Sequence, residues 1–161
     1  MKQLYFLIFT LSSFIWCSCP DGWTSYKTVC ILPRNDQVTW STAQAICPNE
    51  HNQGYMVNEE DAEKHEFVSQ LARDNFPIAS NYHIGLSYAR NSWYWQRPAG
   101  QQAIQVNSTF WNPFYPIVSS TLTAVWNSME GNTTEYGWQN IDKTKSKAYY
   151  FCEIVDTKNI F

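Results

Sequence analysis

Cysteine positions limit the fold of this chain more than any other feature of its sequence. The first of five cysteines, Cys17, ends an N-terminal segment in which Lys2 precedes an apolar run over residues 4–16. That run is too short to span a bilayer and is typical of a secretory signal peptide. We therefore expect residues 1–17 to be removed, with cleavage after Cys17 or Ser18. The alternative is a buried N-terminal strand.

Cleavage there leaves an even set of cysteines, namely Cys19, Cys30, Cys47 and Cys152. An even number in an exported chain predicts two disulfide bonds, for which three connectivities remain open. The mature chain has 161 − 17 = 144 residues, the length of one domain with a sizeable core. No second long apolar run follows, so we expect a secreted, extracellular protein without a membrane anchor. Two sequons predict glycosylation at Asn107 and Asn132.

The start of the mature chain predicts a hairpin followed by a helix. Residues 19–32, CPDGWTSYKTVCIL, have turn chemistry at Asp21 and Gly22 and strand-like residues next to it. Thr39 can then cap a helix, because the following apolar residues recur at helical spacing. The face predicted to be buried consists of Trp40, Ala43 and Cys47.

A second helix is predicted after Asn58, which can cap it. Its first turn would hold the acids favoured there by the helix dipole, Glu59, Glu60 and Asp61. An apolar stripe follows, made of Phe67, Val68 and Leu71, and the opposite face, with His65, is expected to be solvated. Beyond Asp74 the chain becomes aromatic, with short apolar runs such as YHIGL, SWYW, TAVW and KAYYFCEI that predict strands between long loops. Two helices followed by a β-rich half predict an α+β fold.

In their order along the chain, these motifs resemble those of the C-type lectin-like domain. They are CPDGW, TWSTAQAIC in the first helix, HIGL for the family's Trp-Ile-Gly-Leu strand, WYW and FW for its aromatic loop, GWQN for its Trp-Asn-Asp strand, and YYFCE for its closing Phe-Ile-Cys-Glu. The resemblance implies a domain over residues 19–155, with a short tail at 156–161. Two helices, a mostly antiparallel sheet and a long loop region are the fold that it implies.

The resemblance also implies how the cysteines pair. Cys47 would join Cys152, and Cys19 would join Cys30, as in the long form of the family. Family members usually carry one more disulfide in the loop region, but its two positions fall on Ala124 and Lys143. Both cysteines are missing together, so the loop region is expected to be held by packing alone.

Calcium is the cofactor that the resemblance would imply, and the sequence argues against it. The family's calcium ligands align with residues 115–117, 122 and 139–140, and of the family's Glu-Pro-Asn triplet only Pro116 is retained. Ca²⁺ takes about six to eight oxygen ligands, several of them carboxylates. No Asp or Glu occurs over residues 75–129, a stretch of 55 residues, so no shift of the alignment supplies one. We expect neither calcium nor another cofactor.

A site without calcium could still bind sugars, by stacking their C–H faces on aromatic rings and pairing their hydroxyls with amides. The residues expected to cluster there are Trp111, Tyr115, Trp126, Gln139 and Asn140. Strand alternation around Val125 points Trp126 away from the core. Some β-glucan-binding relatives use a Trp-x-His pair, of which Trp126 is retained while Ser128 replaces the histidine. The alternative is that these rings only pack the core and the loop, as the family's core positions do at Trp95, Phe110, Trp111 and Trp138.

Catalysis is not expected. The chain has only three histidines, His51, His65 and His83, and the mature cysteines are assigned to disulfides. Neither a nucleophile elbow nor a His-x-x-x-His pair occurs. The mature chain has 10 basic and 14 acidic residues, a net charge of −4, which gives no support for nucleic acid or an anionic membrane as partner.

Recognition is the class of function that remains. The leading hypothesis is calcium-independent binding of carbohydrate or microbial-surface glycans, in innate defence. The alternative is a protein-binding module without sugar-binding activity, since an exposed aromatic patch also suits a protein interface. The sequence leaves the oligomeric state open.

Overall fold

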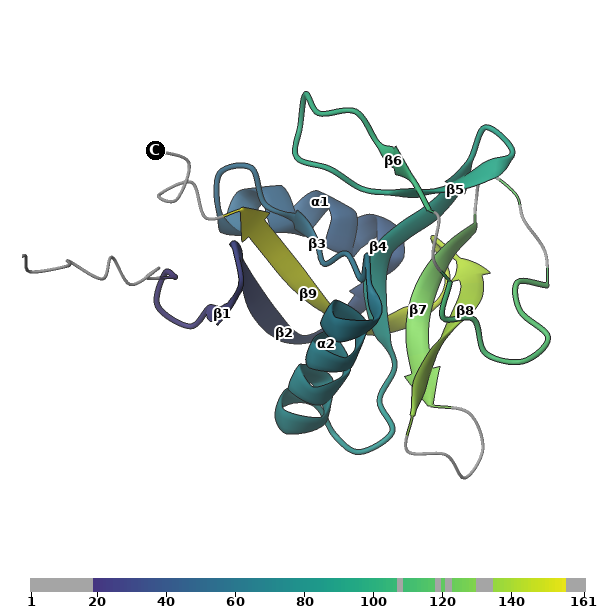
Figure 1. Cartoon of the computed structure of the whole chain (residues 1–161), viewed down its shortest axis with the longest axis horizontal. Coiled ribbons are helices and arrows are strands. Elements are labelled where there is room, and N and C mark those ends of the chain that lie inside the picture. The colour runs from purple at the N-terminus through teal and green to yellow at the C-terminus, as the bar shows by residue number, and fades with distance from the viewer. Residues whose placement is uncertain (1–18, 107–108, 118–119, 121–122, 130–134, 156–161) are drawn as a thin grey trace, which may run out of the picture.

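The computed structural model describes residues 19–106, 109–117, 120, 123–129 and 135–155. Within them lie two helices and nine strands, in the order β1 (Thr24–Tyr26), β2 (Val29–Thr39), α1 (Trp40–Glu50), β3 (Tyr55–Met56), α2 (Ala62–Asn75), β4 (Tyr82–Ala89), β5 (Ser92–Trp95), β6 (Ile104–Gln105), β7 (Thr123–Met129), β8 (Tyr136–Asp142) and β9 (Lys147–Val155). This confirms the α+β class (Figure 1). The expected signal peptide, both sequon asparagines and the tail lie outside the described residues.

The sheet is built around β9 and β4. Strand β9 pairs antiparallel with β2 and β3 and parallel with β4, so the C-terminal strand lies in the interior of the sheet. Strand β4 also pairs antiparallel with β5 and β7, and from it the sheet divides into a β5–β6 branch and a β7–β8 branch. Figure 1 shows both branches on one side of β4, with the two helices on either side of β9. The loops of the long loop region connect these branches.

Helix α1 begins as the sequence predicts. The Thr39 side chain caps it by accepting a hydrogen bond from the Thr42 N–H at 3.3 Å. All three residues of the predicted face, Trp40, Ala43 and Cys47, are buried. The Trp40 indole donates to the Ile84 carbonyl at 2.8 Å, which fixes the helix against β4.

The first hairpin forms, but its turn differs from the predicted one. Strands β1 and β2 pair with Tyr26 opposite Val29, so the hairpin turn is Lys27–Thr28. Lys27 adopts a positive φ of 49° there. Asp21 and Gly22 make an earlier turn that leads into β1.

Helix α2 begins three residues later than predicted. Its cap is Asp61, whose side chain accepts from the Lys64 N–H at 2.8 Å, and not Asn58. Asn58 and Glu59 precede the helix and are completely buried. The prediction of a solvated second face is also wrong for Lys64, which is 6% exposed. Val68 of the predicted stripe is buried, and Phe67 and Leu71 are half-buried against the core.

Two disulfide bonds cross-link the part of the fold made of the N-terminal segment, β2, α1 and β9. Cys19 is bonded to Cys30 in β2, and Cys47 of α1 is bonded to Cys152 of β9, which are the pairs that the family resemblance implies. The second bond spans 105 positions, and closing a loop of that length stabilises the fold by about 4–5 kcal/mol in the chain-entropy account.

Candidate functional site

The loop over residues 109–117 lies beside β8 and is paired with it. The Trp138 N–H donates to the Phe110 carbonyl at 2.7 Å, and the Asn112 N–H donates to the Trp138 carbonyl at 3.0 Å. Trp111 and Trp138 form a parallel bridge between these two bonds. This backbone pairing fixes the position of the aromatic loop without a covalent link.

Asn112 closes the contact from its side chain. Its amide nitrogen donates to the carbonyls of Ser128 and Gly137, both at 3.2 Å. A Cβ atom on residue 137 would overlap with the Asn112 amide, so glycine at this position lets the Asn112 side chain lie against β8. Asn112 therefore joins the loop to both strands of the β7–β8 branch.

Trp111 belongs to the packing of this region. Its ring meets the ring of Trp138 edge-on at 5.7 Å and that of Trp93 at 5.0 Å. Trp138 and Trp95 are buried, while Phe110 and Trp111 are half-buried against the core. The four aromatic residues at family core positions thus pack together.

The five residues expected to form a binding cluster do not form a single one. Trp126 lies opposite Gln139 in the β7–β8 register, and its indole N–H donates to the Gln139 side-chain oxygen at 3.3 Å. Asn140 follows Gln139 in β8 and therefore faces the other side of the branch, the side of Trp138 and Trp111. Tyr115 is half-buried in the loop, and its peptide bond to Pro116 is cis.

The residues in the family's calcium-ligand positions do not fit the ion. The side-chain oxygen of Asn140 accepts a hydrogen bond from the Ile117 N–H at 2.8 Å, and the oxygen of Gln139 accepts from Trp126. Both oxygens thus serve the protein's own structure, and the acid-free stretch supplies no carboxylate to add to them. Across the described parts of the chain, no group of three or more His, Cys, Asp or Glu side chains could hold a metal.

The exposed part of the loop is apolar. Phe114 is 92% exposed and Ile117 is 66% exposed, although both are large hydrophobic residues. Phe114 also adopts a positive φ of 70°, a conformation that costs a residue with a Cβ atom about 1–2 kcal/mol. A hollow of about 770 Å³ lies beside it, with Phe110, Trp111, His65 and Tyr136 among its lining residues.

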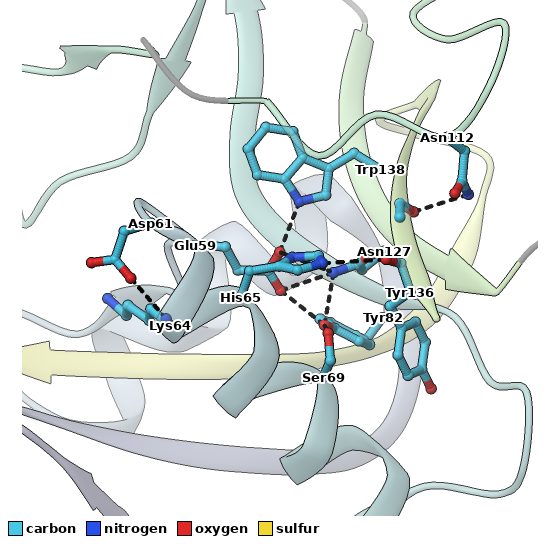
Figure 2. Close-up of polar contacts among 11 residues, drawn as sticks. Glu59, Asp61, Lys64, His65, Ser69, Tyr82, Asn112, Asn127, Tyr136 and Trp138 are labelled. Carbon is cyan, nitrogen blue, oxygen red and sulfur yellow. Dashed lines mark hydrogen bonds and ion pairs between the residues drawn. The ribbon is translucent and has the colours of Figure 1, made fainter. Parts of the chain in front are cut away.

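Behind the loop lies a buried carboxylate, Glu59, which the sequence placed in the first turn of the second helix and which in the structure precedes that helix. Glu59 is completely buried and accepts hydrogen bonds from the Trp138 indole at 2.7 Å, the Tyr82 hydroxyl at 2.8 Å and the Asn127 amide at 2.9 and 3.0 Å. The His65 ring lies 2.7 Å from the same carboxylate. Figure 2 shows these side chains converging on Glu59 from α2, β4, β7 and β8.

His65 is the basic group beside this carboxylate. Burial alone would lower its pKa, but the hydrogen bond to Glu59 and the charge of Glu59 raise it above the ordinary 6.5. Its second ring nitrogen lies 3.2 Å from the Tyr136 carbonyl, so both nitrogens face acceptors, as a protonated ring requires. The ring stacks on Phe110 at 4.4 Å and so connects the buried carboxylate to the aromatic loop.

A second buried ion pair joins α2 to β9. Lys64 Nζ lies 2.8 Å from a Glu153 oxygen, with side-chain exposures of 7% and 2%. The same carboxylate accepts from the Tyr55 hydroxyl at 2.7 Å and from the Asn58 N–H at 3.1 Å. The sequence does indicate that Lys64 is buried, since positions 64, 67, 68 and 71 share one helical face. The burial of Glu59 has no such signal, because its partners other than His65 are far away in the sequence.

Comparison with known proteins assigns the family. Residues 36–154 match the family model of the lectin C-type domain, a stretch that includes both helices and the loop region. The chain belongs to the C-type lectin family. As a C-type lectin it retains the two helices and the sheet, while it lacks the carboxylates of the calcium site.

Curated relatives of this C-type lectin include proteins of pit vipers. One subunit of the snaclec coagulation factor IX/factor X-binding protein of Gloydius halys is 37% identical over 83 residues, which are 50% of this chain and 56% of the relative. The chain thus spans little more than half the length of that relative. One subunit of snaclec salmorin from Gloydius brevicauda is 27% identical over 149 residues, covering 91% of this chain and 90% of the relative.

Solved structures agree on the fold. A complex of SPL-1 with GlcNAc superimposes with a TM-score of 0.72 at 18% identity, over 86% of this chain and 96% of the other. Human lithostathine superimposes with a TM-score of 0.70 at 24% identity, over 86% of this chain and 91% of lithostathine. Of the helices that the structure describes, none is long and apolar enough to cross a membrane.

Proposed function

We propose that this C-type lectin is a secreted recognition protein that binds a protein ligand without calcium, through the tip of its aromatic loop. The observation that carries the proposal is the exposure of Phe114 and Ile117, within four positions of one another in one loop. Large apolar side chains presented to solvent in this way are typical of anchors in protein interfaces.

The backbone at Phe114 supports this assignment. In the free protein, the exposed Phe114 ring and its positive φ both cost free energy. Burial of the ring against a ligand would offset that cost. The hollow beside Phe114 gives a partner's side chain a place to enter. Relatives named for binding coagulation factors add support for a protein ligand as a class.

A second candidate function is glycan binding at Trp126. The ring is half-buried, and its neighbour Gln139 uses its oxygen for the indole while its amide N–H groups have no partner among the described residues. A half-exposed ring beside free amide donors suits a sugar, whose C–H face stacks while its hydroxyls accept hydrogen bonds. This site lies on the other face of the β7–β8 branch from Trp111.

One experiment separates the two candidates. The protein is immobilised in EDTA, exposed to extracellular fluid of its source organism, and compared with Phe114→Ser and with Ile78→Ser. Ile78 is 98% exposed and follows α2, so it is a matched control outside the loop. We expect one protein to be retained by the wild type and by Ile78→Ser but not by Phe114→Ser. Equal retention by all three would overturn the proposal.

A glycan array in EDTA gives the second arm. A signal that survives Phe114→Ser and is lost in Trp126→Ala would favour the glycan candidate. No signal on the array, together with loss of the retained protein in Phe114→Ser, is the result that we expect.

A further inference from the structure

We infer that a second binding site of this protein, outside the aromatic loop, takes an acidic saccharide. The site is a pocket of about 560 Å³ between the β4–β5 hairpin, the loop that leads to β6, and α1, and we call it the hairpin pocket. Its volume lies in the range of small-ligand sites. None of the described residues at the family's calcium-ligand positions lines it.

Strand register builds one wall of the hairpin pocket. Ser87 and Tyr94 are cross-strand partners. Ala89 lies two positions further along β4, and Gln96 directly follows the end of β5, two positions after Tyr94. Because side chains alternate along a strand, these four residues share one face of the hairpin. Tyr94 and Gln96 are half-buried, so this wall presents a phenol ring, an amide and the Ser87 hydroxyl to the pocket.

Amides from two other segments complete the lining. Gln44 comes from α1, and Gln101 and Gln102 come from the loop between β5 and β6. Within the described part of the chain, these three side chains and that of Gln96 have no hydrogen-bond partner. An amide both donates and accepts, as a sugar hydroxyl does, so four of them around one pocket match a ligand rich in hydroxyl groups.

The charges in the hairpin pocket are positive. Arg90 and Arg97 line it and no acid does, because all lining residues except Gln44 come from the acid-free stretch. Arg97 is partly neutralised, since its Nη2 atom lies 3.1 Å from a Glu60 oxygen. Arg90, at the hairpin turn, is exposed and has no ion-pair partner among the described residues. The pocket therefore has one guanidinium that no described side chain of the protein neutralises.

Arginines and amides together select the ligand. A guanidinium binds a carboxylate or a sulfate ester through two parallel hydrogen bonds. A neutral sugar would leave Arg90 unused, and a small inorganic anion would leave the amides unused. A sugar that carries a uronate or sulfate group uses both, and the Tyr94 ring offers an apolar surface for its C–H face.

The test uses a sulfated, uronate-containing tetrasaccharide prepared from heparin, titrated calorimetrically into the full protein at low salt in EDTA. We expect binding that weakens about 10-fold in Arg90→Gln, since a charge-assisted pair is lost. Gln101→Ala is expected to weaken it by a smaller factor. Lys145→Gln, which removes an 81% exposed cation outside the pocket, is the control and should bind like the wild type. Phe114→Ser should also bind normally, because the proposed protein site is elsewhere.

Three results would overturn the inference. The wild type could fail to bind the tetrasaccharide, or Arg90→Gln could bind as tightly as Lys145→Gln, which would make the attraction non-specific. Inorganic sulfate could also compete as strongly as the tetrasaccharide, in which case the pocket holds a simple anion and the saccharide assignment is wrong. Circular dichroism of each variant checks that it is folded.

Discussion

The indole N–H of Trp138 donates to the Glu59 carboxylate at 2.7 Å, across 79 positions of sequence. The bond joins the segment before α2 to β8, the strand against which the aromatic loop is paired. In a fold that has lost the loop disulfide of its family, this buried network holds the loop region to the body of the protein.

Glu59→Ala should therefore destabilise the protein by about 3–5 kcal/mol, because His65, Tyr82, Asn127 and Trp138 would lose a common buried partner. Urea unfolding at pH 7 measures the loss. Glu63→Ala is the matched control, since that side chain is 71% exposed and should cost less than about 0.5 kcal/mol. Similar free energies of unfolding for the two variants would contradict the role assigned to Glu59.

His83 should make the protein sensitive to acid. The ring is completely buried in β4, and burial lowers its pKa from the ordinary 6.5 to about 4. Its folded pKa is below its unfolded pKa, so its contribution is complete above pH 6.5 and is lost as the pH falls toward 4. Between pH 7 and 5 the wild type should lose about 2 kcal/mol that His83→Gln does not lose. Urea unfolding across this range tests it, and parallel pH profiles would contradict it.

His65 should behave in the opposite way. Its pKa is raised in the folded protein by Glu59, so its stabilising contribution is complete below pH 6.5 and is lost as the pH rises through the higher folded value. The difference in unfolding free energy between the wild type and His65→Gln should therefore shrink from pH 6 upward. NMR titration of the imidazole protons of both residues should give a pKa above 6.5 for His65 and a pKa below 6.5 for His83. The reverse order would refute both assignments.

Trp126→Ala should cost little stability, about 1–2 kcal/mol, because the ring is half-exposed and its contacts are one hydrogen bond and a loose stack on the His83 ring at 6.2 Å. Trp111→Ala is the comparison, since that ring packs on Trp93 and Trp138 and its loss should cost about 3–5 kcal/mol. Thermal and urea unfolding of both variants measure the difference. A cost of several kcal/mol for Trp126→Ala would mean that its ring is part of the packing and not of a binding surface.

Removing calcium should change nothing. The oxygens of Gln139 and Asn140 are hydrogen-bonded within the protein, and no carboxylate lies in residues 75–129. We expect the melting temperature and the retention of the protein ligand to be the same in millimolar Ca²⁺ and in EDTA. A marked fall in melting temperature on adding EDTA would show that a calcium site exists.

Local signals made α1 predictable. Its cap, Thr39, and its buried face, Trp40, Ala43 and Cys47, lie within nine consecutive residues, so spacing alone identifies them. The start of α2 was not predictable in this way. Asn58 and Asp61 are both good caps, and the choice between them depends on Glu59, whose burial is determined by Trp138 and Tyr82. No window of neighbouring residues contains those partners.

The candidate site follows the same rule. Absence of acids from the loop region could be read directly from the sequence, and so could the packing role of Trp95 and Trp138. The division of Trp126 and Asn140 between two faces depends on the β7–β8 register, which the sequence alone does not specify. The hairpin pocket is even harder to predict from the sequence, because Gln44 and Gln101 come together only in the folded chain.

The bond between Cys47 and Cys152 has a consequence for proteolysis. Every loop of the binding region lies between these two positions, so a protease that cuts any of them leaves two fragments still joined by the disulfide. A nicked molecule would migrate as one species on a gel until its thiols were reduced. The loops can therefore be cleaved without releasing either half of the protein.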